Sequence, residues 1–586
     1  MERQTIHATL TRHFLRRFLE NDLISPDADR LQLLVVVGAG VFSTTLFITT
    51  FMSFNYIGFP HTPAQAAVLA LSDRFFYVAL SMVVVALVAV SQWDSLVVDA
   101  RDAAILEPLP IQPGTVRRAK LSAVAVLGGA VALAVNVVPS VIFPWLLVFH
   151  QRVTVGAMAT LAVAHLVVTM AAAAFAYLTI IAARETLATL LPAGAFARVS
   201  PWVQGTLIVV LGTALLMIPP AASDTGRRGF EGARALAPPT WFLGVYETAV
   251  GGIIADSPRG RMTARQARTD ALMSAVYARH RVHFPALAGR AATAMSIVIA
   301  LTVITYFSNG RGFSALTPQM AAARRCRWRL PKAVATTLLV RHPAVRAGFF
   351  FALAAMWRSS VHRLTLACAA AVGLAMCLIA LSGIDVREAS RAGHAPQRLL
   401  AVQPLLFGVL LVGFRHAIRV PVELRAGWGF QLAWREQERR FLAGVRRAAL
   451  IGLVVPALAA TLPLFTFVLG PQLAFAHAAL GLAGAIVVLE ALLVGYTKVP
   501  FTCTYLPNEN MKALGPIVFV AFLIGASIFA GMEGAALADR SQAIRLLVIL
   551  AIAFTVLRIA ALRIRRPELV DFHEAPVTTQ RLGLHT

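Results

Sequence analysis

Residues able to do chemistry are sparse in this chain, and several of them lie inside long apolar runs. His165, His477 and Glu490 are ionisable residues of this kind, and Asn136 is an uncharged polar one. An ionisable side chain inside a bilayer is costly, so each marks a candidate functional position. They form no ladder of acidic residues across several runs, a pattern typical of proton- or sodium-coupled carriers. We interpret Glu490, near the end of its run, as a snorkelling or helix-packing carboxylate.

Common enzyme motifs are missing from the sequence. There is no GxxxxGK[ST], HExxH or GxSxG motif, and no GxGxxG follows an expected strand. The nearest metal-like spacing, His280 and His283, is flanked by arginines without a nearby carboxylate, which favours a polar helix face. The four cysteines form no CxxC pair. We therefore expect no catalytic residue, no cofactor and no metal.

Charge is concentrated instead in a loop that runs from Trp93 to Lys120. Residues 95–106 can form a short helix with apolar contacts, and the Pro108–Leu109–Pro110 turn would stop it. A short helix that ends in a rigid turn is a natural docking element for a cytoplasmic partner. The alternative is an ordinary connector whose charges stay solvated. The charged residues ahead of the turn are Asp94, Asp99, Arg101, Asp102 and Glu107.

Composition places these features in a membrane protein. Of the 586 residues, 58% are hydrophobic and only 14% are charged, which is too apolar for a soluble fold. Because a bilayer core of about 30 Å needs roughly 20 apolar residues per helix, the sequence predicts an all-α polytopic protein with twelve spans. The expected spans are about 31–53, 75–93, 120–148, 154–182, 201–221, 291–308, 364–383, 399–414, 447–469, 474–496, 515–533 and 544–562.

The net charge of +25 indicates a membrane orientation rather than nucleic-acid binding. Segment 310–363 carries ten Lys/Arg and no acid, as expected of a cytoplasmic loop that meets anionic lipid. We therefore expect a multi-pass protein of a bacterial inner membrane, with both termini cytoplasmic. Loop 222–290, placed outside by this topology, holds ten arginines and five acids. Long loops follow poorly the rule that positive residues stay on the cytoplasmic side.

The order of segments predicts two copies of one six-span unit. An amphipathic interfacial helix over 1–30 precedes six spans in 31–308, which include the outer loop 222–290. A basic linker and a second interfacial helix over 309–363 precede six spans in 364–562, and 563–586 forms a cytoplasmic tail. Parallel repeats of this kind occur in transporters. The alternative is that any twelve-span protein can be divided into sixes.

The run RDAAILEPLPIQPGTVRRAKL resembles the loop after the second span in permeases of type 2 ABC exporters. The layout is similar too, with an interfacial helix, two spans, a coupling helix, further spans and a larger outer segment before span six. The resemblance implies that the loop sits in a groove of a separate ATPase subunit. The matching positions are Asp99, Arg101, Asp102, Glu107, Leu109, Pro110 and Lys120.

Two features depart from that family. Its members commonly have six spans and pair as dimers, whereas this chain has about twelve. The corresponding loop of the second half lacks the leucine–proline turn and offers Glu423, Arg425 and Trp428 instead. If the halves are equivalent, one docking site is degenerate or the second half is specialised.

Three functions remain in competition. The first is the permease of an ATP-driven exporter, not itself an enzyme, whose partners are cytoplasmic ABC ATPase subunits and the lipid bilayer. The second is a membrane-embedded lipid-linked glycosyl- or acyltransferase, with residues 238–242 of the outer loop lining a lipid cleft. The third is a secondary carrier. The substrate and the direction of transport do not follow from the residues.

Overall fold

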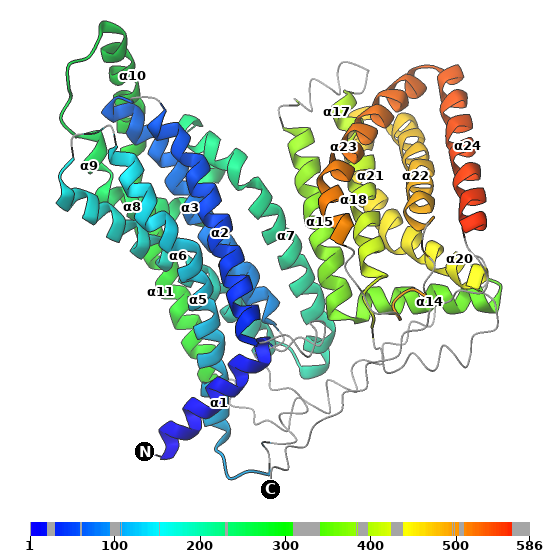
Figure 1. The fold of residues 1–586 in the computed structure, drawn as a ribbon, viewed down its shortest axis with the longest axis horizontal. Coiled ribbons are helices and arrows are strands. Elements are labelled where there is room, and N and C mark those ends of the chain that lie inside the picture. The colour runs from blue at the N-terminus through cyan, green and yellow to red at the C-terminus, as the bar shows by residue number, and fades with distance from the viewer. Residues whose placement is uncertain are drawn as a thin grey trace. The chain divides into compact units, whose positions relative to one another are not determined.

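The computed structural model describes residues 2–19, 30–58, 61–93, 106, 108–149, 151, 153–228, 232–308, 340–382, 384, 396–422, 438–494, 496, 499–502 and 509–564. Every regular element in these residues is helical (Figure 1). The chain divides into two compact units, one of residues 1–207 and 214–326 and the other of residues 208–213 and 327–586. We describe each unit by itself.

The first unit is built around α3 (Pro63–Ser91), the most deeply buried of its long helices. α3 packs against α5, α6, α8 and α10. The remaining helices of this unit are α1 (Glu2–Leu19), α2 (Arg30–Ile57), α5 (Pro113–Val148), α6 (Val155–Leu190), α7 (Ala193–Arg228, apart from residues 208–213), η2 (Gly232–Leu236), α8 (Pro238–Val250), α9 (Gly252–Ala255), α10 (Ala264–Arg281) and α11 (Phe284–Ser308).

Local sequence explains where two of these helices begin. Thr62 accepts a hydrogen bond from the Gln65 backbone and the Gln65 side chain accepts one from the Thr62 backbone, a capping box followed directly by a proline at the first helical position. Thr263 and Gln266 form the same box at the start of α10. The segment expected as outer loop 222–290 is therefore largely helical, and α8 packs on α3, α6 and α11.

The second unit holds two short helices, α14 (Pro343–Arg358) and α20 (Glu438–Ala449), that pack closely on each other. Figure 1 shows α14 lying across the ends of the upright helices of this unit. A π-helical turn, η6 (Leu450–Val454), joins α20 to α21 (Val455–Leu469). The other helices are α15 (Ser360–Leu381), α17 (Gln397–Leu400), α18 (Val402–Ala417), α22 (Pro471–Leu493), α23 (Glu509–Ala538) and α24 (Arg540–Ile564).

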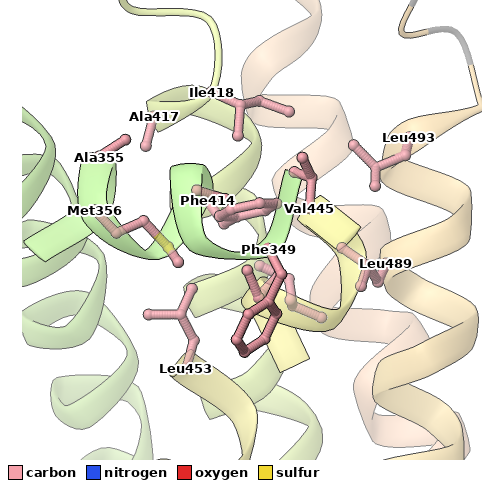
Figure 2. Packing of buried hydrophobic residues seen from close by; sticks show 14 of the residues in the cluster. Phe349, Ala355, Met356, Phe414, Ala417, Ile418, Val445, Leu453, Leu489 and Leu493 are labelled. Carbon is pink, nitrogen blue, oxygen red and sulfur yellow. The ribbon is translucent and has the colours of Figure 1, made fainter. Parts of the chain in front are cut away.

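Glycines allow α14 and α20 to approach so closely. A Cβ atom on Gly348 would lie 2.1 Å from the Phe441 carbonyl oxygen, and one on Gly444 would lie 2.1 Å from the Val345 carbonyl oxygen. Around this crossing the unit buries a large apolar cluster from α14, α18, α20 and α22. Figure 2 shows Phe349 and Met356 of α14 pointing into it beside Phe414 and Val445.

The protein is an all-α polytopic membrane protein. Among the described residues, eleven helices are long and apolar enough to cross a membrane, and each overlaps one of the expected spans from the second to the twelfth. The remaining expected span, 31–53, is helical throughout as part of α2. The expected interfacial segments at the start of each half are also helical, in α1 and α14.

Candidate functional site

The expected docking loop is described only at its end. Asp99, Arg101, Asp102 and Glu107 lie outside the described residues, as do Glu423, Arg425 and Trp428 of the second loop. Leu109 and Pro110 are exposed in a tight turn. In that turn the Leu109 amide donates to the Leu106 carbonyl at 3.2 Å, and the Ile111 amide donates to the Leu109 carbonyl at 2.7 Å.

Helix α1 holds this turn against the start of α5. Leu10 and Phe14 of α1 are buried on Val116, Ala119 and Ala123 of α5, and Leu106 and Ile111 of the turn join the same apolar cluster. We call this cluster the α1–α5 platform. It fixes the chain directly after the expected docking residues to a long helix of the bundle.

Lys120 belongs to the α1–α5 platform and not to the open loop. It is 5% exposed, and its ammonium nitrogen lies 5.3 Å from the centre of the Phe14 ring. A lysine over an aromatic face is held by a cation–π interaction, which strengthens with burial. Lys120 therefore secures α1 on α5, while the turn at Leu109 and Pro110 is exposed.

A second arrangement is a buried ion pair between α3 and α8. Arg74 Nη1 donates to Glu247 Oε1 at 2.5 Å, and both side chains are shielded from solvent, with relative exposures of 1% and 0%. Tyr277 of α10 donates its hydroxyl to Glu247 Oε2 at 2.9 Å. The Arg74 guanidinium lies 4.6 Å from the centre of the Tyr246 ring. Three helices thus meet on one carboxylate.

His165 borders this ion pair. Its Nδ1 lies 3.3 Å from the Tyr246 hydroxyl, and its ring makes edge contacts with Tyr77 and Tyr246. Burial raises the pKa of Tyr246 to about 12, since the phenolate would lose its water. Tyr246 therefore keeps its proton at neutral pH.

Sequence reasoning missed Arg74, Glu247 and Asp73. The second span was expected to begin at residue 75, whereas α3 begins at Pro63 and carries Asp73 and Arg74 into the buried part of the helix. Asp73 accepts a hydrogen bond of 2.5 Å from the Tyr56 hydroxyl. The TPAQ capping box at residues 62–65 is the signal that would have moved the start of the helix.

Glu490 lies inside the second unit between two arginines. Arg446 Nε is 3.1 Å from Glu490 Oε1, and Arg558 Nη1 is 3.4 Å from the same oxygen. The carboxylate is 5% exposed, so it packs α20, α22 and α24 together and does not extend toward the membrane surface. Of the two readings given for Glu490, helix packing matches this geometry.

Two expectations from the sequence concern a metal site and a lipid cleft. The described residues contain no group of three or more His, Cys, Asp and Glu side chains that could hold a metal ion. Residues 238–242, expected to line a lipid cleft in the transferase hypothesis, form the first turn of α8, where Thr240 and Phe242 are buried and Trp241 donates to the Ala235 carbonyl at 2.9 Å. The chain matches no known family model, no curated protein and no solved structure.

Proposed function

We propose that this protein is the membrane-spanning permease of an ATP-driven exporter and that separate ATPase subunits dock on its cytoplasmic loops. The observation that carries the proposal is the α1–α5 platform, which ties the chain after the docking loop to a membrane helix. The protein then supplies the path and the mechanical coupling, and the partner hydrolyses ATP. It works in a bacterial inner membrane with both termini in the cytoplasm.

The α1–α5 platform is suited to transmit movement. α5 is 36 residues long and packs against α2, α3 and α6, so a displacement at its start is passed into the bundle. Burial of Leu10 and Phe14 contributes about 1.5–3 kcal/mol each, enough to keep α1 attached while the loop is pushed. ATP-driven closure of the ATPases would move the loops and switch the permease between its open states as a rigid body.

The charges of the loop provide the specificity. Asp99, Arg101, Asp102 and Glu107 precede the turn within nine residues of sequence, a mixed pattern that a complementary groove can recognise. The exposed Leu109 and Pro110 add an apolar contact at the tip. Charged contacts that become buried against a partner cost about 2–5 kcal/mol to break, whereas solvated charges contribute about 0–1 kcal/mol.

The test is to reverse two charges and measure recruitment of the partner. Arg101→Asp combined with Asp102→Arg leaves the net charge of the loop unchanged, so membrane insertion should be unaffected. We expect the host ATPase to co-purify with the wild-type protein and to be lost from the variant. A double reversal of the exposed Asp256–Arg281 pair is the matched control and should keep the partner.

A second variant tests the α1–α5 platform itself. Phe14→Ala removes the ring from Lys120 and opens the apolar cluster, so we expect the ATPase to bind while its ATP hydrolysis no longer drives export. Export by inside-out vesicles and ATPase activity are measured together. Unchanged partner binding and export in the Arg101/Asp102 variant would contradict the docking role and leave the loop as a solvated connector.

A further inference from the structure

Helices α18, α22 and α23 of the second unit each contribute a polar side chain that is fully buried: Gln403, His477 and Glu533. All three side chains have an exposure of 0%. The three helices pack on one another in pairs. Polar side chains from three packed helices inside an apolar bundle are costly, so their arrangement calls for a function.

His477 and Glu533 face each other directly. His477 Nδ1 lies 2.7 Å from Glu533 Oε1, and the ring of Phe465 covers the imidazole at 4.3 Å between ring centres. Gln403 of α18 contacts α22 one helical turn beyond His477. A Cβ atom on Gly481 of α22 would lie 2.0 Å from the Gln403 Oε1 atom. Glycine at position 481 is what makes room for the amide.

Four polar atoms of this cluster have no hydrogen-bond partner among the described residues. They are His477 Nε2, Glu533 Oε2, Gln403 Oε1 and Gln403 Nε2. Buried polar groups are almost always paired, either with protein or with ordered water. The set includes donors and acceptors, which is what a small hydrogen-bonding ligand such as water requires.

The charge state of the His477–Glu533 pair depends on the ionisable groups that the neighbouring helices carry. α21 carries no ionisable residue, and Glu490, further along α22, is already paired with Arg446 and Arg558. Cys377 of α15 donates its thiol to the Val402 carbonyl. The other ionisable groups described on α17, α18 and α24 and at the end of α23 are Arg398, Arg415, His416, Asp539, Arg540, Arg545, Arg558 and Arg563, and most of these are exposed.

We propose that His477, Glu533 and Gln403 form a proton-binding site inside the second unit. One proton from solvent forms an O–H bond on the Glu533 carboxyl, which then donates a hydrogen bond to His477 Nδ1. A separated ion pair is disfavoured here because His477 Nε2 and Glu533 Oε2 lack the additional hydrogen bonds that would offset the desolvation of two charges. Gln403 holds the water that delivers the proton.

The site is close to one end of all three helices. Gln403 is the second residue of α18, His477 comes six residues after the start of α22, and Glu533 comes five before the end of α23. Six residues of helix span about 9 Å. A proton therefore has only a short path to the solvent at that end, which the topology places outside the cell. The inference does not depend on the ATPase partner.

Infrared difference spectroscopy on the full-length protein in lipid nanodiscs tests the site. We expect the wild-type protein at neutral pH to show the C=O band of a protonated, dehydrated carboxyl, and alkaline pH to remove it. Glu533→Gln should abolish the band. Glu490→Gln is the matched control, because Glu490 is a buried carboxylate paired with two arginines, and its loss should leave the band intact.

Two further spectra make the assignment specific. His477→Phe should keep a protonated carboxyl but shift its band, since the carboxyl loses its hydrogen-bond partner. Gln403→Leu should keep the band and slow its response to a pH jump by removing the bound water. A wild-type spectrum without a protonated-carboxyl band between about pH 5 and pH 9 overturns the proposal without reference to any variant. A band that survives in Glu533→Gln also overturns it.

Discussion

At the scale of single residues, the Arg74–Glu247 pair is the tightest constraint in the first unit. Both groups are withdrawn from solvent, and the carboxylate also accepts the Tyr277 hydroxyl. A buried pair of this kind is weak evidence for net stability, because desolvation offsets much of the attraction. It does specify which helices meet. The pair therefore fixes α8 to α3 and α10 more by geometry than by its net energy.

Removing one partner should be far more damaging than removing both. Arg74→Leu leaves the Glu247 carboxylate buried without compensation, so we expect a loss of about 3–5 kcal/mol in the free energy of unfolding. The double variant Arg74→Leu/Glu247→Leu should recover most of that loss. Thermal unfolding of the purified protein in detergent measures both changes.

The control for this pair is Arg281→Leu, which breaks the exposed contact with Asp256 and should change stability little. A double variant that is as unstable as Arg74→Leu alone would contradict the interpretation. It would mean that packing around Arg74, including its contact with the Tyr246 ring, dominates over charge.

At the scale of helices, the sequence predicted which membrane helices exist better than it predicted where they begin and end. Hydropathy averaged over a window locates apolar runs, so the eleven spans were found where the structure has them. The same averaging started the second span at residue 75, because Asp73 and Arg74 lower the local hydropathy although both are buried. The ion pair with Glu247 joins residues 173 positions apart, and no local pattern contains that information.

The crossing of α14 and α20 offers a test of helix packing. Gly348→Ala places a methyl group against the Phe441 backbone, which cannot move aside as a side chain can. We expect the two helices to separate and stability to fall by about 1–3 kcal/mol, the usual cost of overpacking. Gly444→Ala should behave in the same way because its contact is reciprocal. Urea unfolding followed by near-ultraviolet circular dichroism reports the change.

Gly525→Ala is the matched control for this crossing. It lies within α23 of the same unit, and a Cβ there meets nothing within 4 Å. Alanine is the better helix former, so this variant should be neutral or slightly stabilising. Equal destabilisation at positions 348 and 525 would contradict the close approach of α14 and α20 as the cause of the effect.

At the scale of the whole molecule, the all-α polytopic architecture was predictable because it depends on composition. A chain with 58% hydrophobic residues and apolar runs of spanning length has few other solutions in water or lipid. The helical character of residues 238–281 was not predictable in this way, since α10 has a polar sequence and α8 is too short to span. α8 is instead held by burial of Phe242, Leu243 and Tyr246. Whether the two halves are repeats stays a prediction from layout.

Topology is the property of the whole chain that the arginine distribution predicts most directly. With the N-terminus cytoplasmic, the five expected spans before residue 260, between α9 and α10, place it outside, and the sixth span returns residue 335 to the inside. Reporter fusions at these two positions should therefore give opposite signals, with an alkaline phosphatase active at 260 and inactive at 335. The same side for both would mean that α11 does not cross the membrane. The Arg259–Asp270 contact would then stay outside the cell, and the order of sides in the second half would reverse.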